Sequence, residues 1–126
     1  KVIDFLKNQK KVKEILYPYE PSSKNYKLWK KYYSGATGLL SIVIKSKKKS
    51  LVMKFVNSLE LFGIGYSWGG FESLAILQDL KKQTEYTKGR HFFRFNNDEH
   101  IVRLHIGLED PKDLISDLKK SLKYIK

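Results

Sequence analysis

The architecture of this chain is clearest in residues 101–125, which read Ile-Val-Arg-Leu-His-Ile-Gly-Leu-Glu-Asp-Pro-Lys-Asp-Leu-Ile-Ser-Asp-Leu-Lys-Lys-Ser-Leu-Lys-Tyr-Ile. The first eight residues alternate in character, so a strand here places Arg103 and His105 on the face opposite its apolar side chains. That apolar face comprises Val102, Leu104, Ile106 and Leu108. Asp110 and Pro111 are typical of an N-cap and a first helical residue, and apolar residues then recur at helical spacing. The stretch therefore predicts a strand followed directly by an amphipathic helix.

The same kinds of apolar periodicity and turn signals predict the elements in the rest of the chain. Helices are predicted at residues 2–6, 22–33 and 51–59, strands at 12–17, 39–45 and 73–77, and a polar loop at 81–98. Ser22 or Ser23 is expected to cap the second helix. This order of elements predicts an α+β fold, with a mostly antiparallel sheet and helices packed on one face. We expect residues 1–126 to form a single domain.

Composition narrows the class of protein. The chain has 126 residues and no cysteine, which excludes disulfides and thiol chemistry and is typical of a cytoplasmic protein. No segment approaches the ~18 consecutive apolar residues of a membrane span. The chain opens at Lys1 in helix-like sequence, which suggests a fragment of a longer protein.

The net charge of +12 raises the possibility of a polyanion ligand. The basic residues, however, are 22 lysines and only three arginines. Readers of nucleic-acid bases favour the bidentate guanidinium, so this balance argues against sequence-specific nucleic-acid binding. A solvated lysine surface is the favoured interpretation, and a basic module that binds nucleic acid or another polyanion stays open as the alternative.

The most unusual segment is residues 62–74, Phe-Gly-Ile-Gly-Tyr-Ser-Trp-Gly-Gly-Phe-Glu-Ser-Leu. Four glycines in eight residues are costly inside a helix or central strand, and they indicate a sharply bent backbone or a close approach. Tyr66, Ser67 and Trp68 lie between them. The segment is therefore interpreted as the wall of a binding site.

Two motifs in this sequence resemble those of the pyridoxal-phosphate (PLP) enzymes of cysteine and methionine metabolism, the cystathionine lyase and synthase group. Ser67-Trp-Gly-Gly-Phe-Glu-Ser-Leu74 is similar to the family's Ser-x-Gly-Gly-x-Glu-Ser-Leu segment. Arg103-Leu-His-Ile-Gly-Leu-Glu-Asp110 is similar to its Arg-Leu-x-Ile-Gly-x-Glu-Asp signature. A weaker resemblance extends over residues 17–44. Both motifs stand in the family's order and spacing.

The resemblance implies a fold and a set of site residues. The chain would be the small C-terminal domain of a fold-type I PLP enzyme, with Arg103 binding the substrate's α-carboxylate. A guanidinium suits this role because it offers two parallel donors and is always charged. Ser67 and Trp68, with Tyr66 beside them, would form the rest of the substrate-binding wall. Trp68 favours the cystathionine β-lyase branch.

The same resemblance implies what this chain lacks. The large PLP-binding domain and its anchoring lysine would lie upstream, so no catalytic residue and no bound PLP are expected in these 126 residues. The complete enzyme would convert cystathionine to homocysteine, pyruvate and ammonia and would form a homo-oligomer. A γ-lyase or γ-synthase of the same family is the alternative within the resemblance.

Several other patterns in the sequence do not indicate a functional site. Gly63-Ile-Gly65 begins like a dinucleotide fingerprint, but Trp68 replaces its third glycine. His91, His100 and His105 lack a metal-ligand spacing, so no metal is expected. Thr87-Lys88 superficially resembles a PLP-lysine motif but lies in a polar loop. Glu72 is expected to satisfy buried backbone donors.

Overall fold

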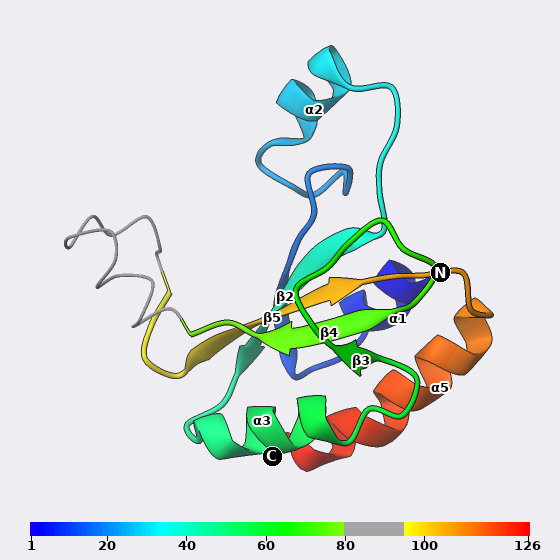
Figure 1. The fold of residues 1–126 in the computed structure, drawn as a ribbon. Coiled ribbons are helices and arrows are strands. Elements are labelled where there is room, and N and C mark those ends of the chain that lie inside the picture. Colours follow the sequence, from blue (N-terminus) through cyan, green and yellow to red (C-terminus); the bar gives the residue numbers. More distant parts are fainter. Residues whose placement is uncertain (80–94) are drawn as a thin grey trace.

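The structure, a computed structural model, describes residues 1–79 and 95–126. Its centre is a five-stranded sheet with the strand order β1-β2-β5-β4-β3 (Figure 1). The strands are β1 (Val12–Leu16), β2 (Leu39–Lys45), β3 (Gly63–Ile64), β4 (Leu74–Leu77) and β5 (Glu99–His105). All neighbouring strands are antiparallel except β3 and β4, which are parallel. The predicted α+β fold with a mostly antiparallel sheet is therefore confirmed.

The register of the central strands fixes which side chains share a face. Arg103 lies opposite Ser41 of β2 and Ile76 of β4, in the middle of the sheet. Because side chains alternate along a strand, Val102 and Leu104 point to the other face. The predicted separation of Arg103 from the apolar row is thus present in the structure.

Three helices cover the apolar face of the sheet (Figure 1). They are α1 (Val2–Lys7), α3 (Lys49–Asn57) and α5 (Pro111–Ser121), the last extended by a short 3-10 turn, η1 (Leu122–Tyr124). The core they form with the strands includes Leu6, Leu40, Ile42, Ile44, Val52, Phe55, Val102, Leu104, Leu114 and Leu118. Burying large side chains of this kind contributes about 1.5–3 kcal/mol each, so this face supplies most of the stability. None of these helices is long and apolar enough to cross a membrane, and the same holds for α2.

Helix α2 (Tyr26–Tyr32) is different, because it projects from the end of β1 and covers neither face of the sheet (Figure 1). The prediction of a helix in this segment was right. The prediction of a serine cap was wrong: the N-cap is Asn25, whose side chain makes no capping bond. The Ser23 hydroxyl instead accepts a hydrogen bond of 3.3 Å from the Asn25 backbone N–H. The chain therefore makes a further turn at residues 23–25 before α2 begins at Tyr26.

The end of β5 also differs from the sequence-based expectation. The strand stops at His105, and Leu108, predicted to lie on the apolar face, is 85% exposed. The reason is that the chain leaves the sheet to contact the glycine segment, where the Leu108 backbone N–H donates to the Phe71 carbonyl at 2.8 Å. The predicted cap of α5 is confirmed, since the Asp110 carboxylate accepts from the Lys112 backbone N–H at 2.7 Å.

Candidate functional site

The candidate site is built around Arg103, on the face of the sheet that α1, α3 and α5 leave uncovered. The Arg103 Nη2 atom donates to the carbonyl oxygens of Tyr66, in a short contact, and of Ser67 at 3.4 Å. The guanidinium carbon lies 5.4 Å from the centroid of the Tyr66 ring and 5.8 Å from that of Trp68. Both distances are within the range of cation–π attraction. The structure therefore brings together all four residues that the sequence singled out.

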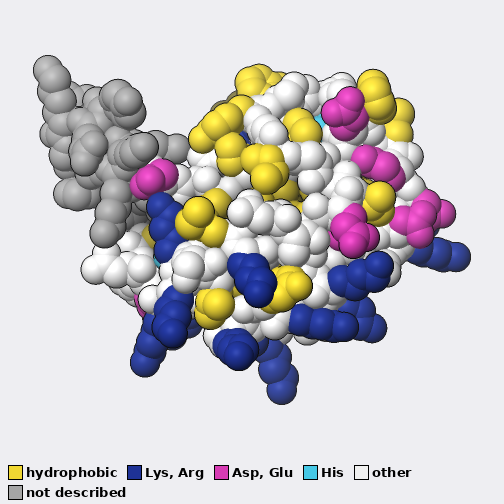
Figure 2. All heavy atoms as spheres, turned by 60° about the horizontal axis from the view of Figure 1, so that its bottom comes forward, with side chains coloured by type: hydrophobic (Ala, Val, Ile, Leu, Met, Phe, Trp, Pro, Cys, Tyr) yellow, Lys and Arg dark blue, Asp and Glu magenta, His cyan; other side chains and the backbone are white. Residues whose placement is uncertain are grey.

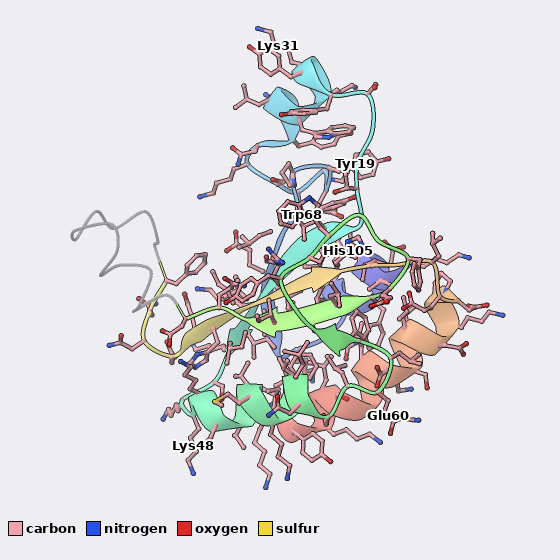
Figure 3. The ribbon with its side chains drawn as sticks, viewed as in Figure 1. Tyr19, Lys31, Lys48, Glu60, Trp68 and His105 are labelled. Carbon is pink, nitrogen blue, oxygen red and sulfur yellow. The ribbon has the colours of Figure 1, made fainter. Side chains whose placement is uncertain are left out.

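The aromatic residues of this site belong to the loop between β3 and β4, which crosses over the sheet (Figure 3). Tyr66, Ser67 and Trp68 are all exposed. Gly69, which follows them, has a backbone φ of +77°, a conformation that a side chain would strain. The loop thus holds two large rings against a cation while leaving their other faces open.

Arg103 keeps donors available for a ligand. Only its Nη2 atom is engaged by the loop carbonyls, and the guanidinium has five N–H donors in total. Among the residues that the structure describes, no carboxylate forms an ion pair with it. A cation held by carbonyl groups and rings, without a counter-charge, is suited to binding an external anion.

A hydrogen-bonded cluster fastens the end of the glycine segment to the end of β5; we call it the Ser73–Glu109 latch, formed by Ser73, Gly107 and Glu109. The Glu109 carboxylate accepts from the Ser73 backbone N–H and from the Ser73 hydroxyl, each at 2.7 Å. The Ser73 hydroxyl oxygen in turn accepts from the Gly107 backbone N–H at 2.9 Å. Ser73 is fully buried, so these donors have no access to water. The latch fixes where the loop returns to the sheet.

The electrostatics of Glu109 follow from this geometry. Burial alone raises the pKa of its carboxyl group. The hydrogen bonds from Ser73 and from the backbone of Glu109 itself favour the charged form, and the lowering causes together outweigh burial, so the pKa lies below its ordinary value. Nearby His105 acts in the same direction. Glu109 is therefore a carboxylate at neutral pH and acts as an acceptor.

Gly107 allows the close approach within the latch. A Cβ atom at this position would lie 2.1 Å from the carbonyl oxygen of Phe71 and 2.6 Å from a carboxylate oxygen of Glu109. Both are far inside van der Waals contact, and the first is with backbone. Gly107 is thus required by the packing of the glycine segment on the end of β5.

His105 lies on the same strand face as Arg103 and forms a hydrogen bond with the loop between β3 and β4. Its Nε2 atom lies 3.1 Å from the Gly70 carbonyl oxygen, which can only accept, so Nε2 carries the proton. The ring is buried, and its Nδ1 atom has no hydrogen-bond partner. The prediction that His105 packs and hydrogen-bonds is confirmed.

The glutamate that satisfies buried donors was assigned to the wrong residue. Glu72 is exposed, whereas Glu109 takes the role that was predicted for Glu72. The latch was missed because its members are 34 to 36 residues apart in the sequence, and no local pattern pairs them. The available signal was that Ser73 lies in the 67–74 motif and Glu109 in the 103–110 motif.

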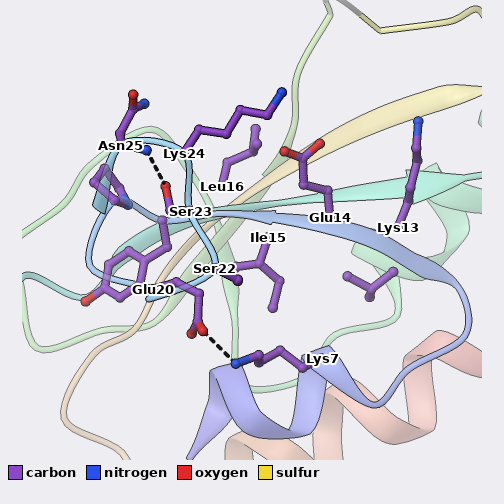
Figure 4. A pocket seen from close by; sticks show the side chains of 13 residues that line it. Lys7, Lys13, Glu14, Ile15, Leu16, Glu20, Ser22, Ser23, Lys24 and Asn25 are labelled. Carbon is purple, nitrogen blue, oxygen red and sulfur yellow. Dashed lines mark hydrogen bonds and ion pairs between the residues drawn. The ribbon is translucent and has the colours of Figure 1, made fainter. Parts of the chain in front are cut away.

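Cavities of the described chain also lie away from Arg103. One of ≈ 500 Å³ lies along β1, near α1 and the 18–25 loop, and is crossed by an ion pair of 2.6 Å between Lys7 and Glu20 (Figure 4). It contains none of the predicted site residues. Because Tyr66, Ser67 and Trp68 are exposed, the site at Arg103 is an open wall among the described residues.

The described residues contain no candidate for the PLP-anchoring lysine. A PLP-anchoring lysine must lose water to lower its pKa, but no lysine in residues 1–79 or 95–126 is buried. Thr87-Lys88 and His91 lie outside the described residues. Within the described part, no three metal-ligating side chains come together. The Arg103 guanidinium, which can pair with a carboxylate or a phosphate, is the anion-binding group of this site.

Comparison with known proteins identifies the family of this chain. The model of the family described as Cys/Met metabolism PLP-dependent enzymes matches residues 1–123. A cystathionine β-lyase of Bordetella avium is 40% identical over 96% of this chain, and the enzyme MetC of Escherichia coli is 36% identical over 94%. An L-alanine/L-glutamate racemase of Wolbachia pipientis is 35% identical over 96%.

A solved structure is similar as well. The crystal structure of a protein assigned as an O-acetylhomoserine (thiol)-lyase from Campylobacter jejuni, containing pyridoxyl-lysine monophosphate, matches 96% of this chain with a TM-score of 0.71 and 28% identity. The chain covers 25% of that protein and 29% of each of the three relatives named above. By sequence and by fold, it belongs to the family of Cys/Met metabolism PLP-dependent enzymes.

Proposed function

We propose that residues 1–126 act as the C-terminal small domain of a PLP-dependent carbon–sulfur lyase of the cystathionine β-lyase type. In this role the chain supplies the wall that binds the substrate's α-carboxylate. The observation that carries the proposal is the Arg103 guanidinium, which lies against Tyr66 and Trp68 without a counter-charge among the described residues.

The proposed work of Arg103 is to hold and orient the substrate. A carboxylate that takes both terminal nitrogens of the guanidinium must displace a loop carbonyl from Nη2, because that atom already donates to Tyr66 and Ser67. The two new bonds would join two ionised groups in a bidentate pair and would hence be stronger than the bonds to neutral carbonyl groups. Substrate binding is therefore expected to shift the loop backbone at Tyr66 and Ser67.

Orientation is the larger contribution to rate. Two parallel bonds fix the plane of the carboxylate, and with it the direction of the bond that must break at the α-carbon. A displacement of about 1 Å can lower the rate ~100-fold. Tyr66 and Trp68 restrict the guanidinium on its ring side, while the Ser73–Glu109 latch fixes the loop that carries them.

The remaining chemistry belongs to a large PLP-binding domain that this chain does not contain. The bound cofactor supplies the electron sink for that chemistry. The complete enzyme is proposed to convert L-cystathionine and water to homocysteine, pyruvate and ammonia, as a cytoplasmic homo-oligomer. The 126 residues alone are expected to be inactive.

The type of cleavage is proposed on Trp68 and on the similar proteins. Cystathionine β-lyases are among them at 34–40% identity, but cystathionine γ-lyases of Macaca fascicularis and Homo sapiens are 34% identical over 97% of this chain. The racemase shows that a relative as similar can carry out another reaction. Substrate and product must therefore be measured.

The test uses the complete polypeptide, incubated with PLP and L-cystathionine, followed by identification of the keto acid. We expect pyruvate, with no 2-oxobutyrate. 2-Oxobutyrate would assign the enzyme to the γ-lyases. Interconversion of D- and L-alanine without release of a keto acid would assign it to the racemases.

A further inference from the structure

The protein has an apolar surface that the described part of its fold leaves exposed. None of the seven residues of α2 is buried, although α1, α3 and α5 each bury at least two. Leu28 is 57% exposed, Tyr32 65% and Tyr33 67%. An isolated helix shorter than ~12 residues is marginal in water, so a seven-residue helix depends on packing. We call this region the aromatic surface: Tyr19, Leu28, Trp29, Tyr32 and Tyr33.

The aromatic surface is held in place from within. The Tyr19 and Trp29 rings meet edge to face at 4.5 Å, and Tyr26 stacks on Trp29 at 5.7 Å. The Trp29 indole N–H donates to the Gly35 carbonyl at 3.2 Å, which ties the helix to the segment that leads into β2. A hollow of ≈ 390 Å³ lies between these elements. The surface is thus pre-organised, which lowers the entropic cost of binding a partner.

The position of this surface relates it to the candidate site. Tyr19 and Trp68 lie on the same side of the molecule, away from Lys48 and Glu60 (Figure 3). The opposite side, formed by α3 and α5, carries a concentration of lysines (Figure 2). Because lysine side chains are well hydrated, that side does not need to be buried against a partner. The exposed aromatic residues of α2 and of the site loop share the other side.

We propose that the aromatic surface is the docking surface for the large PLP-binding domain of the complete enzyme. This inference rests on the proposed function and extends it by naming the contact. The chain spans about 29% of the length of its relatives, so a family enzyme has a large remaining part to contact it. A domain seated on α2 would also overhang the loop that holds Tyr66 and Trp68. The open wall at Arg103 would thereby become an enclosed substrate site.

The charge of α2 specifies the surface it would contact. The helix carries Lys27, Lys30 and Lys31 and no acidic residue. A complementary surface therefore has an apolar centre that fills the hollow and an acidic rim that faces the three lysines. A second copy of this chain would bring the same lysines together, and like charges at a rim oppose association.

Hydroxyl-radical footprinting tests the proposal on the 126-residue chain and on the complete polypeptide. We expect oxidation of Tyr32 and Tyr33 to be severalfold slower in the complete polypeptide. Tyr124, which is 39% exposed on η1, is the matched control and should react equally in both. Equal rates at Tyr32 and Tyr33 would overturn the proposal. Protection already present in the isolated chain, together with dimerisation, would assign the surface to a second copy and also overturn it.

A pair of matched variants gives an independent readout. Leu28→Ser on α2 should lower the thermal midpoint of the complete polypeptide and leave that of the 126-residue chain nearly unchanged. Met53→Ser on α3, 48% exposed, should affect neither. Equal effects of Leu28→Ser in both polypeptides would contradict docking. PLP binding and keto-acid release are measured in parallel: their absence with a protected α2 refutes the proposed reaction but not the contact.

Discussion

Removal of the Glu109 carboxylate should destabilise the protein through the latch. In Glu109→Ala, the Ser73 backbone N–H loses its 2.7 Å bond, and the Ser73 hydroxyl loses its acceptor. Ser73 is fully buried, so water cannot replace the carboxylate without entering the core. Leaving a buried donor unsatisfied costs about 1–3 kcal/mol. With two donors affected and Glu109 itself half-buried, we expect a loss of about 2–3 kcal/mol.

Urea unfolding followed by circular dichroism measures this change, and for a domain of this size the same loss lowers Tm by roughly 8–12 °C. Glu109→Gln is the conservative control: its amide oxygen can accept from the Ser73 N–H and its amide nitrogen can donate to the Ser73 hydroxyl oxygen. It should cost much less than Glu109→Ala. Glu60→Ala removes an exposed glutamate 3.9 Å from Lys120 and should cost almost nothing. If Glu109→Ala costs no more than Glu60→Ala, the latch does not stabilise the fold.

Three further predictions concern the same region. Gly107→Ala should destabilise the protein by about 1–3 kcal/mol because the added Cβ would overlap the Phe71 carbonyl. Gly70→Ala, at a position with open space around it, should not destabilise the protein. Urea unfolding of the two variants measures the difference. Because the folded-state pKa of Glu109 is lowered, the stabilisation that its carboxylate contributes is full above the ordinary value of 4.5 and is lost as the pH falls through the folded pKa. The difference in unfolding free energy between the wild-type protein and Glu109→Gln should therefore shrink in acid. A difference that stays constant with pH would contradict this. Substrate should change the fluorescence of Trp68 in a complete polypeptide whose other tryptophans, Trp29 included, are replaced by phenylalanine, since carboxylate binding is expected to shift the loop backbone at Tyr66 and Ser67. An unchanged spectrum at saturation would argue against that shift.

Much of the fold could be predicted because its signals are local. The alternation in residues 101–105 and the helical stripe from Leu114 to Leu122 each depend on neighbours in the sequence, and both are confirmed. The Asp110 cap is equally local. Errors appeared where the chain leaves regular structure. Leu108 continued the pattern of the strand, but the contact with Phe71 turns it out to solvent.

The candidate site was only partly accessible from sequence. Arg103 could be placed on the free face by strand periodicity, and the glycines around Trp68 indicated an unusual loop. Their contact, and the latch that holds the loop, depend on pairings across more than 30 residues, which periodicity does not encode. The short parallel strand β3 was missed because it is only two residues long, one of them glycine, and pairs with residues eleven positions later.

The most direct test of the account is Arg103→Leu in the complete polypeptide, with Arg103→Lys beside it. We predict that kcat/KM for L-cystathionine falls at least ~30-fold, since removing one partner of a buried charge pair costs 2–5 kcal/mol. Lysine keeps the charge but not the paired donors, so it should restore only part of the loss. The affinity for PLP should remain unchanged in both variants. An equal loss of PLP binding and of substrate binding, or an unchanged kcat/KM, would contradict the carboxylate-binding role of Arg103.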